Sequence, residues 1–223
     1  MIKFILFLLL VLFGGLTIAV GLVNYKYRQG ENRDIETYSF LNQFPYEMQG
    51  ENDMKYSLLV RLFATLFSLT FAIFGLMTFW LHDTGEYKPF SDYFISVVLF
   101  LLACSFISEF LITLKNYKIH LLSSSVLFGG TIVSYAFIGV YILLRPDSEM
   151  FHSSLAYVLL IIGAVLLLSI IIAPLKRWMY LEKEEKNGVI TYHRKHLSIL
   201  PFMEWIFIFA NILLVALLTF FSK

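Results

Sequence analysis

The chain has few of the residues on which disulfide-stabilised or nucleic-acid-binding proteins depend. Cys104 is the single cysteine among 223 residues, which excludes an intrachain disulfide and leaves the redox compartment undetermined. Charged residues make up 15% of the chain, whereas soluble proteins have about 25%. The net charge is only +1, and no basic run is interleaved with aromatic residues. These features argue against a nucleic-acid partner.

The motifs of common catalytic and cofactor-binding folds are also missing. The sequence has no G-x-S-x-G elbow, no P-loop and no glycine-rich dinucleotide fingerprint. His120 with Ser123 or Ser124 is the only arrangement that suggests a catalytic dyad, and neighbours three or four apart on one helix are a common coincidence. No cofactor and no metal are therefore expected, and the sequence favours a non-catalytic protein.

Hydrophobic residues are abundant and gather in long blocks. They form 59% of the chain, and the mean hydropathy is +0.76. Each block is near or above the length of about 20 residues that a helix needs to cross a hydrocarbon core. The blocks are continuous rather than alternating, which argues against a membrane barrel. The sequence predicts one membrane domain (1–223), an all-α polytopic integral membrane helical bundle of about six transmembrane helices. These spans are 4–23, 57–81, 93–115, 120–144, 154–175 and 201–221.

The distribution of basic residues predicts how the chain threads the membrane. Lys3 before an apolar run, and "AVG" at 19–21, are also typical of a secretory signal. If the first block is instead a retained span with the N-terminus outside, 13 of the 17 basic residues fall on the inner side. Cytoplasmic loops carry such an excess. We therefore predict that both termini are outside, in the plasma (cell) membrane, with cytoplasmic loops at 24–56, 116–119 and 176–200.

Two of the cytoplasmic loops carry local signals. Apolar residues at helical spacing in "DIETYSFLN" (34–42) are compatible with a short helix on the membrane surface or with a solvated loop. Asn187-Gly188 between β-permissive flanks favours a small hairpin, and the alternative is a helix extension that ends at Gly188. The three tryptophans fall near predicted span ends, as an interfacial belt requires. They are Trp80, Trp178 and Trp205.

Charged residues inside the apolar blocks predict a polar site. Arg61 and Glu109 each lie six residues from a loop lysine, about 9 Å into consecutive antiparallel spans, so we expect them to pair. His120 and Glu204 begin their spans on the same inner side, and Asn211 follows Glu204 by two helical turns. The hypothesis is an intramembrane polar cluster in the inner leaflet. Its members are Arg61, Glu109, His120, Glu204 and Asn211.

This cluster has two interpretations. Intramembrane charges commonly mark substrate, ion or proton sites. In the alternative, Arg61 and Glu109 only hold two helices together, or Arg61 extends toward the headgroups.

The predicted outer loops offer a different candidate site, because they combine histidines with carboxylates. Such ligands suit zinc or manganese, but their spacing matches no metal motif, and an acidic rim outside the membrane equally explains them. The residues are His82, Asp83, Glu86, Asp92, Asp147, Glu149 and His152. On the inner side, "HRKH" (193–196) is better explained as a basic segment that meets anionic lipid.

Three classes of function follow. The sequence favours a multi-pass membrane protein that is a non-catalytic membrane component or a small transporter-like protein with the inner-leaflet polar cluster. One alternative is an integral membrane enzyme with a surface site of loop histidines and carboxylates. The other is a structural or assembly subunit of a membrane complex. Expected partners are the lipid bilayer and other membrane subunits, and the sequence does not name a small-molecule or ion ligand.

Overall fold

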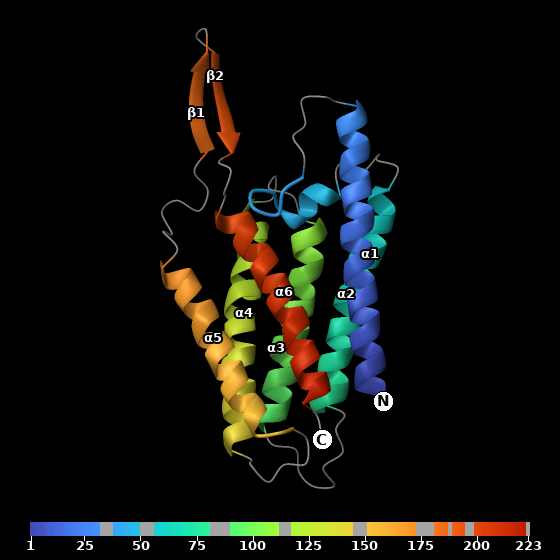
Figure 1. Cartoon of the computed structure of the whole chain (residues 1–223), viewed down its shortest axis with the longest axis vertical. Coiled ribbons are helices and arrows are strands. Elements are labelled where there is room, and N and C mark those ends of the chain that lie inside the picture. Colours follow the sequence, from blue (N-terminus) through green and yellow to red (C-terminus); the bar gives the residue numbers. More distant parts are fainter. Residues whose placement is uncertain are drawn as a thin grey trace.

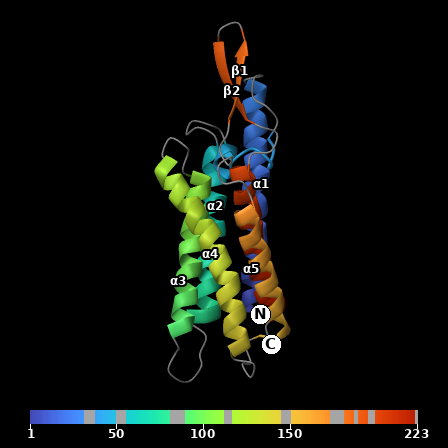
Figure 2. The ribbon, with the colours of Figure 1, turned by 90° about the vertical axis from the view of Figure 1, so that its left-hand side faces the viewer.

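Six long helices run side by side along the long axis of the computed structural model (Figure 1 and Figure 2). The structure describes residues 1–31, 38–49, 56–80, 90–111, 117–144, 151–172, 181–186, 189–194 and 199–221. The helices are α1 (Ile2–Glu31), α2 (Ser57–Gly75), α3 (Phe90–Leu111), α4 (Tyr117–Leu144), α5 (Ser154–Ile172) and α6 (Ile199–Phe220). A π-helical turn, η2 (Leu76–Trp80), continues α2. All six are long and apolar enough to cross a membrane, which confirms the predicted number of long apolar helices.

The surface of the bundle explains why these segments are helical. Large apolar side chains such as Leu58, Ile161 and Ile172 are more than 60% exposed. In water, so much apolar surface would promote aggregation, whereas lipid solvates it. Lipid offers no hydrogen bonds to the backbone, and a helix satisfies its backbone groups internally. The fold is therefore compatible with a multi-pass membrane protein.

Close helix contacts depend on glycine in the packing of α4 against α5. A Cβ atom at Gly139 would lie 2.9 Å from Leu160 Cγ and 3.1 Å from the Ala156 carbonyl oxygen. A Cβ atom at Gly163 would lie 3.1 Å from Tyr135 Cβ. Small residues at such positions let helix backbones approach within van der Waals distance, which is the main attraction between helices in lipid.

One end of the bundle is covered by residues 38–49, which we call the cap segment. It lies across the end where α3 stops and α4 and α6 begin (Figure 1). The cap segment contains a single 3₁₀ turn, η1 (Pro45–Met48), which starts with the proline that suits a first helical position. Of the short helix considered for 34–42, residues 34–37 lie outside the described ranges, and 38–42 are not helical. The surface helix is therefore not formed over 38–42, where only Asn42 is buried, while much of 43–49 is buried.

Beyond the same end, a two-stranded antiparallel hairpin projects from the bundle (Figure 1). Strand β1 (Leu181–Lys186) pairs with β2 (Val189–Arg194) in a register that runs from Leu181↔Arg194 to Lys186↔Val189. The predicted hairpin is confirmed, while Asn187 and Gly188 themselves lie outside the described residues. Both chain termini lie at the opposite end of the bundle.

Candidate functional site

Three helices bring two carboxylates and one imidazole together near the capped end. Glu109 lies two residues before the end of α3, His120 in the first turn of α4, and Glu204 in the second turn of α6. His120 Nδ1 is 3.9 Å from Glu109 Oε2, and His120 Nε2 is 3.1 Å from Glu204 Oε1. Their side chains are at most 1% exposed. We call these three residues the acid–histidine cluster.

If Glu109 and Glu204 are both carboxylates, most polar atoms of this cluster have no hydrogen-bond partner among the described residues, whereas a shared proton would join the two carboxyl groups. They are both carboxylate oxygens of Glu109, Oε2 of Glu204 and both ring nitrogens of His120. The 3.1 Å contact between His120 and Glu204 is close, but its geometry falls short of an aligned hydrogen bond. One oxygen is satisfied, because Ser124 Oγ donates to Glu204 Oε1 at 2.9 Å. An unmet polar atom in the interior costs about 1–3 kcal/mol, and more if it is charged.

The cluster also has an unbalanced set of ionisable groups. Two carboxylates face one imidazole, so even a protonated His120 neutralises only one of them. An uncompensated ion inside a protein costs several kcal/mol. Protonation of one carboxyl group, or a cation held between the three side chains, would remove this cost. One ligand atom from each residue lies within 4.8 Å of the others, which is close enough for a shared ion.

The cap segment closes the cluster from the end of the bundle. The rings of Phe44 and Tyr46 meet the His120 ring edge-on, with centroids 5.2 and 5.5 Å away. Tyr38 donates from its hydroxyl to the Phe44 carbonyl at 3.0 Å. Burial raises the pKa of Tyr38 well above its usual value, so this hydroxyl stays a donor at neutral pH. His120 is therefore enclosed by aromatic rings on its loop side.

Helices α1 and α6 hold the cap segment in place through its backbone. Asn24 Nδ2 donates to the carbonyl oxygens of Met48 at 3.1 Å and Gln49 at 2.7 Å. Trp205 Nε1 donates to the Gln43 carbonyl at 3.2 Å. Trp205 is thus buried at 2% exposure, and its assignment to an interfacial belt is wrong. Trp80 is 40% exposed, and Trp178 lies outside the described residues.

The predicted pair of Arg61 and Glu109 is wrong, because Gln49 lies between α2 and α3. With its amide oxygen turned toward Arg61, Gln49 accepts from Nη2 at 2.6 Å and Nε at 3.0 Å. Its amide nitrogen then donates to the Phe110 carbonyl at 2.7 Å. The nearest basic group recorded for Glu109 is His120 instead, at 3.9 Å. Gln49 carries no periodic or compositional signal in the sequence, so its role was not predicted.

Asn211 belongs to a second polar layer deeper in the bundle. Its Nδ2 donates to Thr131 Oγ1 at 2.6 Å and to the Phe207 carbonyl at 2.8 Å. In the same region, the Tyr135 hydroxyl donates to the Ala210 carbonyl at 2.6 Å. These bonds tie α4 to α6 about 10 Å from Glu204 along the helix. The structure therefore joins Glu109, His120 and Glu204, but gives Asn211 a separate contact.

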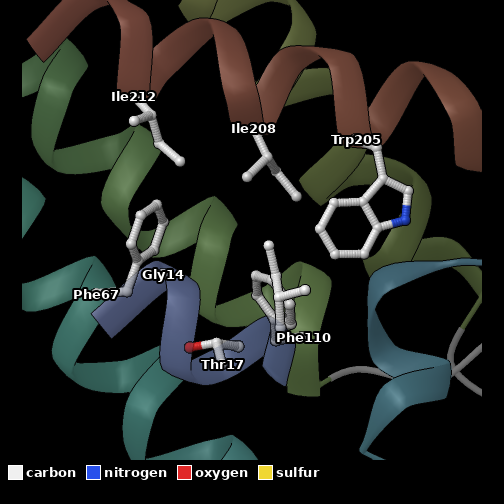
Figure 3. Close-up of a pocket in the computed structure, with 8 residues that line it drawn as sticks. Gly14, Thr17, Phe67, Phe110, Trp205, Ile208 and Ile212 are labelled. Atoms are coloured by element: carbon white, nitrogen blue, oxygen red, sulfur yellow. The ribbon is translucent and has the colours of Figure 1, made fainter. Parts of the chain in front are cut away.

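A small apolar cavity lies between α1, α2, α3 and α6 near the cluster (Figure 3). Its volume is about 10 Å³, roughly one water-sized probe. Figure 3 shows the rings of Phe67, Phe110 and Trp205 around it. Organic ligands occupy pockets of about 300–1,000 Å³, so this cavity does not hold one in the present conformation. The lining residues are Gly14, Thr17, Ile18, Phe67, Phe110, Trp205, Ile208 and Ile212.

Most of the alternative surface site lies outside the described residues. This applies to His82, Asp83, Glu86, Asp147 and Glu149. Of the remaining two, Asp92 is 2% exposed at the start of α3 and accepts a hydrogen bond from Ser91 Oγ at 3.2 Å. His152 is exposed, and its backbone N–H donates to the Phe221 carbonyl at 3.0 Å.

Comparison of the chain with protein-family models, with curated proteins and with solved structures finds no match. The acid–histidine cluster is the feature of the described structure from which a function can be argued.

Proposed function

We propose that this chain is a six-span integral membrane protein whose acid–histidine cluster binds a small cation. Both termini lie outside, and the capped end of the bundle faces the cytoplasm. The protein acts as a transporter-like membrane component rather than as an enzyme. The convergence of two buried carboxylates on one imidazole, with five polar atoms lacking partners, supports the proposal most strongly.

A purely structural role for the cluster fits this observation less well. A structural ion pair matches opposite charges, and the rest of each group's hydrogen-bonding capacity is usually satisfied. Glu109 and Glu204 instead share one His120, and both oxygens of Glu109 lack a hydrogen-bond partner. Well-packed apolar residues would stabilise the three helices as well or better. The ionisable groups are therefore best explained by a ligand of positive charge.

An enzyme at this site is also less well supported. Ser123 and Ser124 lie on the same helix as His120, and both hydroxyls are engaged. Ser123 Oγ donates to the Ser105 carbonyl at 3.1 Å, and Ser124 Oγ donates to Glu204. Neither hydroxyl donates to a ring nitrogen of His120, which nucleophilic activation would require. The one small apolar cavity described beside the cluster, of about 10 Å³, is itself too small for an organic substrate.

The threading is tested by cysteine labelling in intact cells. Cys104 is first replaced by alanine, and single cysteines are then introduced as Ile2→Cys and Glu184→Cys. We expect a membrane-impermeant maleimide to label Ile2→Cys in intact cells. It should label Glu184→Cys, in the hairpin, only after the membrane is permeabilised. Labelling in the reverse pattern would refute the proposed orientation.

Cation binding is tested by thermal unfolding of the purified full-length protein in detergent. Each of a series of chloride salts of monovalent and divalent cations is added to the wild type and to the Glu109→Gln, Glu204→Gln double variant. A ligand that binds only the folded state raises the unfolding temperature, by an amount that grows with its concentration. We expect at least one cation to stabilise the wild type but not the double variant. If every cation acts equally on both proteins, the proposal is wrong.

A further inference from the structure

We infer that the cation bound by Glu109, His120 and Glu204 is a divalent first-row transition metal, with zinc or manganese as the best match. This inference rests on the proposed function and gives the ligand a chemical class. The donor set is one imidazole nitrogen and two carboxylates. Zinc accepts both nitrogen and oxygen ligands, whereas calcium and magnesium are bound through oxygen. A monovalent ion would gain little from the imidazole.

The distances in the cluster fit a metal site that has not closed fully. Zinc bonds of 2.0–2.1 Å place two tetrahedral ligand atoms about 3.3 Å apart. His120 Nε2 and Glu204 Oε1 are already 3.1 Å apart. One ligand atom from each of the three residues lies within 4.8 Å of the others, so the remaining movement is on the order of 1 Å. Glu109 can make that movement by side-chain rotation, which would exchange its contacts with Ser123 and Glu204 for a bond to the metal.

The unpartnered atoms are an independent observation that points to a ligand. Glu109, His120 and Glu204 are 0%, 1% and 0% exposed, and their side chains converge from three different helices. Each of them presents at least one polar atom with no hydrogen-bond partner. One ligand atom from each residue lies within 4.8 Å of the other two, so a single ion between the helices could contact all three side chains.

Surrounding residues supply the support that metal ligands usually have. Ser124 Oγ donates to Glu204 Oε1 at 2.9 Å and fixes that carboxylate. The aromatic rings of Phe44 and Tyr46 hold the plane of the His120 imidazole. Such outer contacts orient the ligands, and their loss typically lowers metal affinity 10–100-fold. The three ligands belong to the polar cluster predicted from the sequence, but no metal-binding motif marks them, because they are 11 and 84 positions apart along the chain.

The test is metal binding by the purified full-length protein after chelator treatment. Cobalt(II) is the probe, because its visible absorption reports coordination by protein ligands. Zinc content after buffer exchange gives the stoichiometry. We expect about one metal per chain, and an affinity at least about 100-fold lower in Glu204→Gln, since the loss of a ligand exceeds the loss of an outer contact. The matched control is Asp92→Asn, which removes a buried carboxylate from the other end of α3 and should leave the affinity unchanged.

A second variant guards against misfolding of Glu204→Gln. Glu204→His replaces one metal ligand with another, so it should keep cobalt binding and change the absorption spectrum. The inference is wrong if the wild type binds neither zinc, cobalt nor manganese. It is also wrong if Glu204→Gln and Glu109→Gln bind metal as tightly as the wild type, which would assign the metal to other histidines. If only sodium or potassium stabilises the wild type, and the double glutamine variant loses this effect, the bound cation is not a transition metal. The proposed cation site would then still stand.

Discussion

The contact between Gly21 and the cap segment gives a quantitative prediction about how the cluster is closed. A Cβ atom at Gly21 would lie 2.8 Å from both Cβ and Sδ of Met48, closer than real Cβ atoms approach. Met48 is fully buried, and its carbonyl is held by Asn24. The Gly21→Ala substitution therefore requires the cap segment to shift or open. Forcing a methyl group into a packed interior costs about 1–3 kcal/mol.

Gly15→Ala is the matched control, because it makes the same change on the same helix. A Cβ atom at Gly15 meets nothing within 4 Å. Alanine is favoured over glycine in a helix by about 0.8–1.0 kcal/mol, and both substitutions gain this term. The difference in stability between the two variants therefore measures the cost of the clash alone, about 1–3 kcal/mol. This cost corresponds to about a 5- to 150-fold change in the equilibrium constant for opening of the cap segment.

Limited proteolysis with chymotrypsin measures this opening, because the cap segment contains Tyr38, Phe40, Phe44 and Tyr46. When opening is fast relative to cleavage, the cleavage rate follows the population of the open form. We expect Gly21→Ala to be cut in this segment about 5- to 150-fold faster than Gly15→Ala. Equal rates for the two variants would show that the cap segment does not depend on its contact with Gly21, and the packing argument would be refuted.

Three further predictions concern the helices. Asn211→Leu should lower the unfolding free energy in detergent by about 0.6 kcal/mol, and by at most about 1.7 kcal/mol, the average and maximum for hydrogen bonds between membrane helices. An unchanged unfolding free energy would show that the second polar layer does not stabilise the bundle. Gly139→Ala should lower the thermal unfolding temperature, whereas Gly129→Ala should not, because a Cβ atom at Gly129 meets nothing within 4 Å. The double variant Arg61→Glu, Glu109→Arg should fold no better than either single variant, as judged by size-exclusion chromatography. The reason is that Arg61 contacts Gln49 and Glu109 contacts His120. If the double variant folds better than both single variants, Arg61 and Glu109 pair directly after all.

The helices could be predicted because their signal is local. Each apolar block is long enough to cross a membrane. In lipid, the backbone N–H and C=O groups have to form their hydrogen bonds within the helix. The hairpin also has a local signal, since Asn187-Gly188 favours a tight turn wherever its flanks lie. The hypothesis of a polar cluster that includes Glu109, His120 and Glu204 follows from their positions near the inner ends of their spans. These inferences need only spacing along the chain and the thickness of a bilayer.

The partner of Glu109 could not be predicted in the same way. Depth in consecutive antiparallel spans favours Arg61 as the partner, whereas His120 stands at the start of its span. The choice depends on residues 38–49, whose polar and aromatic side chains show no clear period. This segment is positioned by bonds from Asn24 and from Trp205, the latter 162 positions from its acceptor Gln43. Contacts so distant in sequence leave no pattern that spacing can detect.

The cap segment therefore determines whether the acid–histidine cluster is exposed to water or buried. His120 is only three residues from the start of α4, where water would ordinarily reach it and satisfy the unpartnered atoms. Phe44 and Tyr46 cover it instead, so a polar helix end becomes a dry site. In that environment the attraction between two carboxylates and a cation is far stronger than in water. The same contacts that bury the cluster thus provide the physical reason to expect a ligand there, and opening the cap segment should raise the apparent dissociation constant for the cation in inverse proportion to the population of the closed form.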